Sequence, residues 1–176
     1  MTGVQTCALP ILDHCHIGPV KKEFLDPIIK IKEEIINRHG VCFMFLIHGM
    51  SARIQKIVND NVHMVIGYGQ GDPPSYSCDL EYKDRFMYVL QLNGFNAYQG
   101  QSGGRFSAWH EKNMNQLFRK KYKDERVHSL QIEIISGLRT LPQTAENVGI
   151  VLGQIANRTT WRLDKVPVDF SVREFC

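Results

Sequence analysis

The sequence predicts an α/β fold: three layers, with a mostly parallel mixed sheet and helices on both of its faces. Residues 41–47 are seven consecutive apolar residues, the composition of a strand buried on both faces of a parallel sheet. Amphipathic helical patterns lie before this strand and near the end of the chain, so helices and strands alternate. With 43% hydrophobic residues among 176, the chain can bury a sizeable core.

The first helix and strand are predicted by apolar spacing and by one glycine. Apolar residues recur every three or four positions from Leu25 to Ile35, which predicts a helix over residues 21–38. Gly40 is placed to end this helix. Pro27 must then lie in the first turn, where its missing N–H costs least.

The rest of the chain continues the alternation. Apolar runs and glycine breaks predict a strand, a helix, a strand, a helix, a strand and a helix, at residues 62–66, 84–93, 95–98, 109–121, 128–135 and 144–158. The glycine-rich segment 67–71 closes the first of these strands. The tail from residue 161 to 176 has no interpretable pattern, and the sequence carries no signal for an oligomeric state.

His48 and Glu133 are the candidate functional residues. His48 closes the first strand, and ligand sites of open α/β sheets lie at the carboxyl ends of strands. Alternation in residues 128–135 places Glu133 on the face opposite the apolar residues. Since a buried carboxylate without a partner is costly, Glu133 either opens to a cleft or meets a cation. The structural alternatives are a hydrogen-bonded edge histidine and a solvent-facing acid.

A polar loop at residues 99–105 is a third candidate. Gly103 and Gly104 would let the backbone approach a ligand closely, and Arg105 follows them. The alternative is an ordinary surface loop.

Several function classes are excluded by composition. The net charge of +3 is small, and the basic segment 119–123 is followed at once by two acids, which indicates a solvated helix end and no nucleic-acid partner. No apolar run reaches the roughly 18 residues that a membrane span needs. The five cysteines lack the paired spacing of a metal or disulfide framework and fit a reducing, cytoplasmic compartment.

The first eleven residues resemble a translated sequencing adapter. We therefore expect residues 1–11 to be a non-native scar and residues 12–176 to be a single partial domain whose native N-terminus is missing.

Four segments, in order, resemble the N-formylglutamate amidohydrolase family of zinc-dependent exopeptidase-like α/β proteins. The family's Asp-x-His-Ser-Met, Val-x-Gly-x-x-x-Gly and Gly-Tyr-x-Val strand motifs are similar to residues 46–50, 65–71 and 94–97, the last with the Gly103-Gly104 pair. Its His-x-Leu-Gln-Ile-Glu-Ile strand matches residues 128–134 almost residue for residue. The resemblance spans residues 40–158.

This resemblance implies a zinc site and its chemistry. His48 would be a zinc ligand, and Glu133 the carboxylate that activates metal-bound water. Two further ligands are expected from an absent upstream segment. His14 and His16 are the candidates within this chain, and the alternative that we favour is that they are the remnant of a family segment that carries a Tyr-His before the helix. Arg105 is the expected contact to a substrate carboxylate, because guanidinium pairs bidentately with that group.

We therefore expect the full-length protein to be a zinc-dependent amidohydrolase that cleaves an amide bond in a small carboxylate-bearing substrate. This chain would be an incomplete, inactive fragment of it. The alternatives are a carboxypeptidase-like or peptidoglycan-cleaving hydrolase, or a non-catalytic binding module with the same fold.

Overall fold

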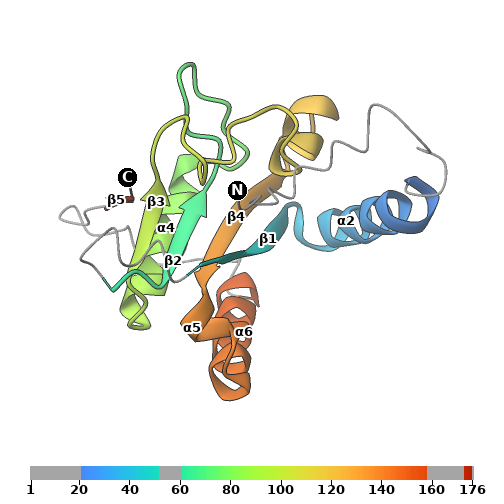
Figure 1. The fold of residues 1–176 in the computed structure, drawn as a ribbon. Helices are drawn as coiled ribbons and strands as arrows, with labels where there is room; N and C mark the ends of the chain where they lie inside the picture. Colours follow the sequence, from blue (N-terminus) through green and yellow to red (C-terminus); the bar gives the residue numbers. More distant parts are fainter. Residues whose placement is uncertain (1–20, 52–60, 158–172, 176) are drawn as a thin grey trace.

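The computed structural model describes residues 21–51, 61–157 and 173–175, which form a mixed sheet with helices packed on it (Figure 1). Its strands are β1 (Cys42–Met50), β2 (Met64–Gly67), β3 (Ala97–Gly100), β4 (Val127–Ile135) and β5 (Glu174–Phe175). Its helical segments are η2 (Lys21–Leu25), α2 (Asp26–His39), α4 (Leu80–Leu92), η3 (Leu117–Lys121), α5 (Ser136–Arg139) and α6 (Pro142–Asn157).

The sheet consists of two parallel blocks joined at one antiparallel pair. The strand order is β1-β4-β2-β3-β5. β1 is parallel to β4, and β2, β3 and β5 are parallel to one another, whereas β2 is antiparallel to β4. The carboxyl ends of β1 and β4 therefore lie at the same end of the sheet. The carboxyl ends of β2 and β3 lie at the opposite end.

The two faces of β4 differ in chemistry, as its alternation predicts. Leu130, Ile132 and Ile134 project from one face of β4 into the largest core cluster, which also contains Phe86 from α4 and Val148 from α6. We call this side of the sheet the core face. The opposite face carries three polar residues, and we call it the site face. Helices cover both faces, which confirms the three-layer α/β class.

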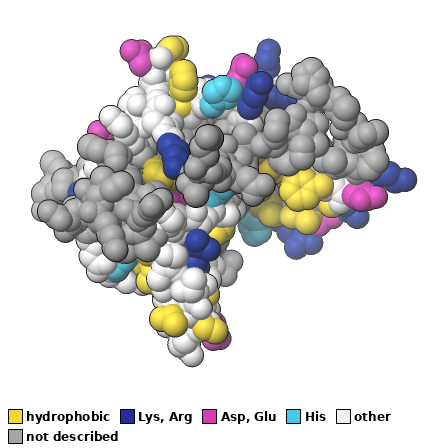
Figure 2. All heavy atoms as spheres, in the orientation of Figure 1, with side chains coloured by type: hydrophobic (Ala, Val, Ile, Leu, Met, Phe, Trp, Pro, Cys, Tyr) yellow, Lys and Arg dark blue, Asp and Glu magenta, His cyan; other side chains and the backbone are white. Residues whose placement is uncertain are grey.

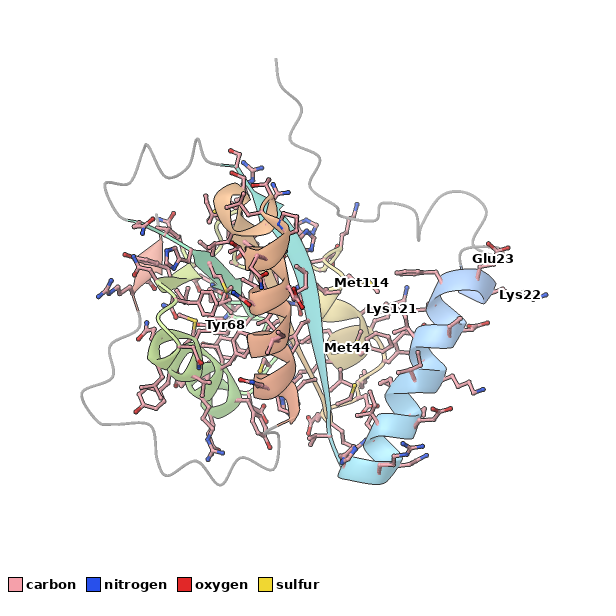
Figure 3. All side chains as sticks on the ribbon, turned by 90° about the horizontal axis from the view of Figure 1, so that it is seen from below. Lys22, Glu23, Met44, Tyr68, Met114 and Lys121 are labelled. Atoms are coloured by element: carbon pink, nitrogen blue, oxygen red, sulfur yellow. The ribbon has the colours of Figure 1, made fainter. Side chains whose placement is uncertain are left out.

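Two small apolar clusters bracket the polar part of the site face. At the amino ends of β1 and β4, Cys42 and Val127 pack against Ile36 of α2 and Phe118 of η3. Figure 3 shows Met44 lying between β1 and α2, in the same cluster. At the other end, a second cluster contains Met50, Val65, Tyr98 and Ile135.

The prediction that β1 is buried on both faces is wrong. Its middle residues are half-buried, and Ile47 is 52% exposed. Among the described strands β1 pairs with β4 alone, so it lies at the edge of the sheet and has less cover than a central strand. It also continues past His48 to Met50.

The helix predicted at residues 109–121 is wrong in its first half and confirmed at residues 115–121. In the described chain the segment 109–114 forms turns, and regular helix is confined to its end. Side-chain hydrogen bonds compete with the helix here, since Asn113 Oδ1 accepts the N–H of Asn115 at 2.9 Å. Gln116 Nε2 also donates to the carbonyl oxygen of Ala108, whose φ is 56°.

The remaining boundaries lie close to those expected. α2 ends at Gly40, whose φ of 80° is left-handed and whose N–H donates to the Ile36 carbonyl, and Pro27 lies in the first turn. α4 begins at Leu80, four residues before the predicted start, and α5 was not predicted. Within the described ranges no helix is both long and apolar enough to span a membrane. The adapter-like segment, His14, His16 and most of the tail lie outside the described residues.

The contribution of the core cluster to stability can be tested by mutation. Phe86→Ala should reduce the free energy of unfolding by about 3–5 kcal/mol, because the ring is 2% exposed and its loss leaves a cavity. Leu92→Ala, at a 63% exposed position of the same helix, should change it by less than about 0.5 kcal/mol. Urea denaturation measures both. Equal losses in the two variants would contradict the core assignment.

Candidate functional site

The register of the β1–β4 pair places the two predicted residues next to each other. His48 lies directly opposite Glu133 in this parallel pair. Cross-strand partners project from the same face of a sheet, so both side chains lie on the site face. His48 is half-buried, and Glu133 is 7% exposed. The structure therefore brings an imidazole and a buried carboxylate together near the carboxyl ends of two parallel strands.

Glu133 is buried, and three basic residues act on it electrostatically. Burial raises the pKa of Glu133 above its ordinary value of 4.5, although the charges of His48, Arg105 and Arg139 oppose this rise. Gln131 Nε2 donates a hydrogen bond to Glu133 Oε1 at 2.9 Å, which also lowers the pKa. A carboxylate with a raised pKa is better suited to accept a proton near neutral pH.

Glycines position the loop that carries Arg105. The carbonyl oxygen of Phe106 occupies the space that a Cβ at Gly67 would need, and it lies 2.6 Å from the Cβ position of Gly100. Gly67 pairs with Gln131 in the β2–β4 ladder, so the loop crosses the site face beside the polar residues of β4. This close approach accounts for glycine at the ends of β2 and β3.

Gly103 and Gly104 shape the same loop. Gly103 has a φ of 66° and donates its N–H to the Gln70 carbonyl at 2.9 Å, and Gly104 donates to the Gln101 carbonyl at 2.9 Å. Both therefore have a turn-forming role in the loop that leads to Arg105. Their contact with a substrate stays a prediction, as does that of the exposed Arg105 side chain.

Sequence reasoning missed Arg139, which ends α5. Its guanidinium lies against Gly49, where an added Cβ would stand 2.5 Å from Arg139 Cζ. The residue after His48 must therefore be small for Arg139 to take this position. The glycine at this position was the available sequence signal, but α5 itself lacks the length for a recognisable helical pattern.

The described residues do not make a complete zinc site. A catalytic zinc needs three protein ligands. In the described part of the chain no group of three His, Cys, Asp or Glu side chains is placed to hold a metal ion, and the site face offers one imidazole and one carboxylate. The donor set present here thus does not fit the implied zinc by itself.

A separate hollow of about 540 Å³ lies between α2 and residues 118–126. Its charged side chains are balanced in sign, and Lys32 pairs with Asp124 at 2.8 Å. Figure 2 likewise shows basic and acidic side chains interspersed over the visible face. None of the predicted site residues lines this hollow, so we place no function there.

Burial of Glu133 makes a prediction about pH. Because its pKa is raised in the folded state, the unfolded chain releases this proton first as the pH rises, and the free energy of unfolding falls. Glu133→Gln removes this loss. Urea denaturation should therefore show a larger stability gain for the variant at about pH 8 than at about pH 4.

The matched control is Glu146→Gln, at an exposed position of α6. Its stability difference from the parent should be the same at both pH values. A Glu133→Gln difference that is equally independent of pH would contradict the raised pKa of Glu133.

The loop contact makes another prediction. Gly67→Ala should reduce the free energy of unfolding by about 1–3 kcal/mol, because the new methyl overlaps the Phe106 carbonyl and overpacking is destabilising. Gly149→Ala, in α6 with open space at its Cβ position, should instead stabilise the protein by up to about 1 kcal/mol through helix propensity. Thermal unfolding compares the two variants, and a neutral Gly67→Ala would argue against the close approach.

The fold has a counterpart among solved structures. The chain is similar to the crystal structure of an N-formylglutamate amidohydrolase from Ralstonia eutropha JMP134, with a TM-score of 0.52 and 17% sequence identity. The match covers 78% of this chain and 49% of that one, so the chain spans about half the length of the similar protein. No family model matches the sequence, and no curated protein matches it. The expected resemblance is thus confirmed at the level of the fold, which is that of an amidohydrolase structure.

Proposed function

We propose that this chain belongs to a hydrolase that cleaves an amide bond in a small, carboxylate-bearing substrate. The observation that carries the proposal is the pairing of His48 with Glu133 on one face, at the carboxyl ends of parallel strands. Few structural roles require a carboxylate that is 7% exposed near the end of a sheet strand. Residues of this kind cluster at functional sites.

Glu133 is the proposed general base. Gln131 holds Oε1, so Oε2 is the oxygen available to a substrate-side water. In the reaction, Glu133 takes a proton from the attacking water while the water oxygen bonds to the amide carbon. It then returns the proton to the leaving nitrogen as the carbon–nitrogen bond breaks.

Arg105 is the proposed binding residue. Its guanidinium is carried on the loop that crosses the site face beside Gln131, and it is close enough to act electrostatically on Glu133. An exposed guanidinium beside a reacting centre can bind a substrate carboxylate with two parallel hydrogen bonds. Gly103 and Gly104 support this role through the turn that they form.

Zinc dependence belongs to the same proposal. His48 would supply one ligand, and the others would come from outside the described residues. The similar solved protein is titled an N-formylglutamate amidohydrolase, so N-formylglutamate is the first substrate to test. The incomplete ligand set within the described chain favours one alternative, a non-catalytic module that keeps the fold.

The test compares this chain with a longer version that contains the corresponding upstream gene sequence. Formate release from N-formylglutamate should be detectable in the longer protein with zinc and absent in this chain. Isothermal titration should show tight zinc binding in the longer protein alone. If the longer protein binds no zinc and releases no formate or other amide product, the non-catalytic alternative is correct.

Glu133→Gln in the active longer protein should lower kcat by roughly 10²- to 10⁴-fold, the range for loss of a general base, while zinc affinity persists. His48→Ala should instead weaken zinc binding itself. Glu146→Gln, on the exposed side of α6, is the control and should leave kcat unchanged. Near-normal turnover of Glu133→Gln would assign the carboxylate a structural role.

A further inference from the structure

We propose that a one-way chain of largely buried side-chain hydrogen bonds, running from Ser129 to Glu133, makes Gln131 present its N–H group to the carboxylate. It would hold Glu133 Oε1 as an acceptor and reserve Oε2 for the substrate side. The residues between the two ends are positioning residues. The catalytic meaning of this inference rests on the proposed function, but the hydrogen-bond chain can be tested without it.

Four side-chain hydrogen bonds form the chain. Ser129 Oγ donates to Asn115 Oδ1 at 2.5 Å, and Asn115 Nδ2 donates to Asn113 Oδ1 at 2.9 Å. Asn113 Nδ2 then donates to Gln131 Oε1 at 2.8 Å, and Gln131 Nε2 donates to Glu133 Oε1 at 2.9 Å. Every donor points toward the carboxylate.

The chain is largely buried and complete. Asn115 is fully buried, Ser129 is 2% exposed and Gln131 is 4% exposed, whereas Asn113 is half-buried. In the described part of the protein no buried side-chain nitrogen or oxygen lacks a hydrogen-bond partner. A buried amide that turned around would face another donor or another acceptor, which costs the desolvation of both groups. The donor-to-acceptor direction along the chain, which we call its polarity, therefore has one favourable sense.

A backbone group sets that polarity. The main-chain N–H of Asn115 donates to Asn113 Oδ1 at 2.9 Å, and a main-chain N–H can only donate. Asn113 must therefore turn its oxygen to this N–H and its NH₂ to Gln131. Gln131 must in turn face Asn113 with its oxygen and Glu133 with its NH₂.

The polarity complements the charges around Glu133. His48 from β1, Arg105 from the loop and Arg139 from α5 act on the carboxylate electrostatically. Among the described residues, Gln131 is the group that hydrogen-bonds to it. The chain thus fixes the geometry of one oxygen, whereas the cations contribute charge.

This role also explains why residues 109–114 are not helical. The turn puts Asn113 and the following Asn115 over the site face, where they bond with β4 side chains that alternate at positions 129 and 131. In a regular helix, positions two apart point to different sides. Asn113 and Asn115 could not then both serve one strand face.

The test measures hydrogen-bond scalar couplings by NMR in the isotopically labelled full chain. In the parent protein we expect a coupling between Gln131 Nε2 and the carboxylate carbon of Glu133, and one between Asn113 Nδ2 and the side-chain carbonyl carbon of Gln131. These couplings report the direction of each bond. Their absence in the folded parent would overturn the proposal without any variant.

Asn113→Asp tests what sets the polarity. The new carboxylate can only accept, so Gln131 then lies between two acceptors and its NH₂ group loses its single favoured side. The Nε2 coupling to Glu133 should therefore fall, and a coupling to residue 113 should appear. Asn147→Asp, which adds the same charge at an exposed position of α6, should leave the coupling at Glu133. A coupling to Glu133 that keeps its full size in folded Asn113→Asp would contradict the proposal.

A kinetic readout applies once activity is established in the longer protein. Asn113→Asp should lower kcat at least 10-fold with little change in KM, because substrate binding by Arg105 is untouched. An equal rise in KM, or an unchanged kcat, would count against a positioning role. If the longer protein is inactive, the couplings still decide the hydrogen-bond chain, so the two proposals fail separately.

Discussion

The parallel register of β1 and β4 is the constraint on which the rest of the site depends. It sets His48 opposite Glu133, and it sets both on the face away from the main core. A slip of one residue would send every side chain of β1 to the opposite face and would bury the imidazole against the core. Strand pairing thus positions the His48 and Glu133 side chains next to each other without further specific contacts.

This register buries the carboxylate of Glu133, which costs free energy. The surrounding structure offsets that free energy in two ways. The charges of His48, Arg105 and Arg139 favour the ionised form of Glu133, and Gln131 gives it a direct hydrogen bond. The apolar clusters at both ends of the site face provide the compensating burial. The net effect still raises the pKa of Glu133, which leaves the group able to take up a proton at a higher pH than usual.

Local pattern predicted the parts of this structure that are local. The α/β class, the two faces of β4 and the choice of His48 and Glu133 as candidates follow from runs and alternation in single segments, whereas their adjacency depends on the register. The edge position of β1 depends on which strands pair, and no apolar run encodes that. Arg139 and the asparagines at 113 and 115 were missed for a related reason. Arg139 is carried by a short helix and acts on Glu133 through its charge, and the asparagines reach the site through a turn where side-chain hydrogen bonds override helix propensity.

The most direct test of this account is the energetic coupling between His48 and Glu133. A double-mutant cycle with His48→Ala, Glu133→Gln and the double variant, followed by urea denaturation, measures that coupling in the free energy of unfolding. Adjacent side chains on one face should give a coupling of about 0.5–3 kcal/mol. Additivity within about 0.3 kcal/mol would contradict the account, because it would mean that the imidazole and the carboxylate do not share a site.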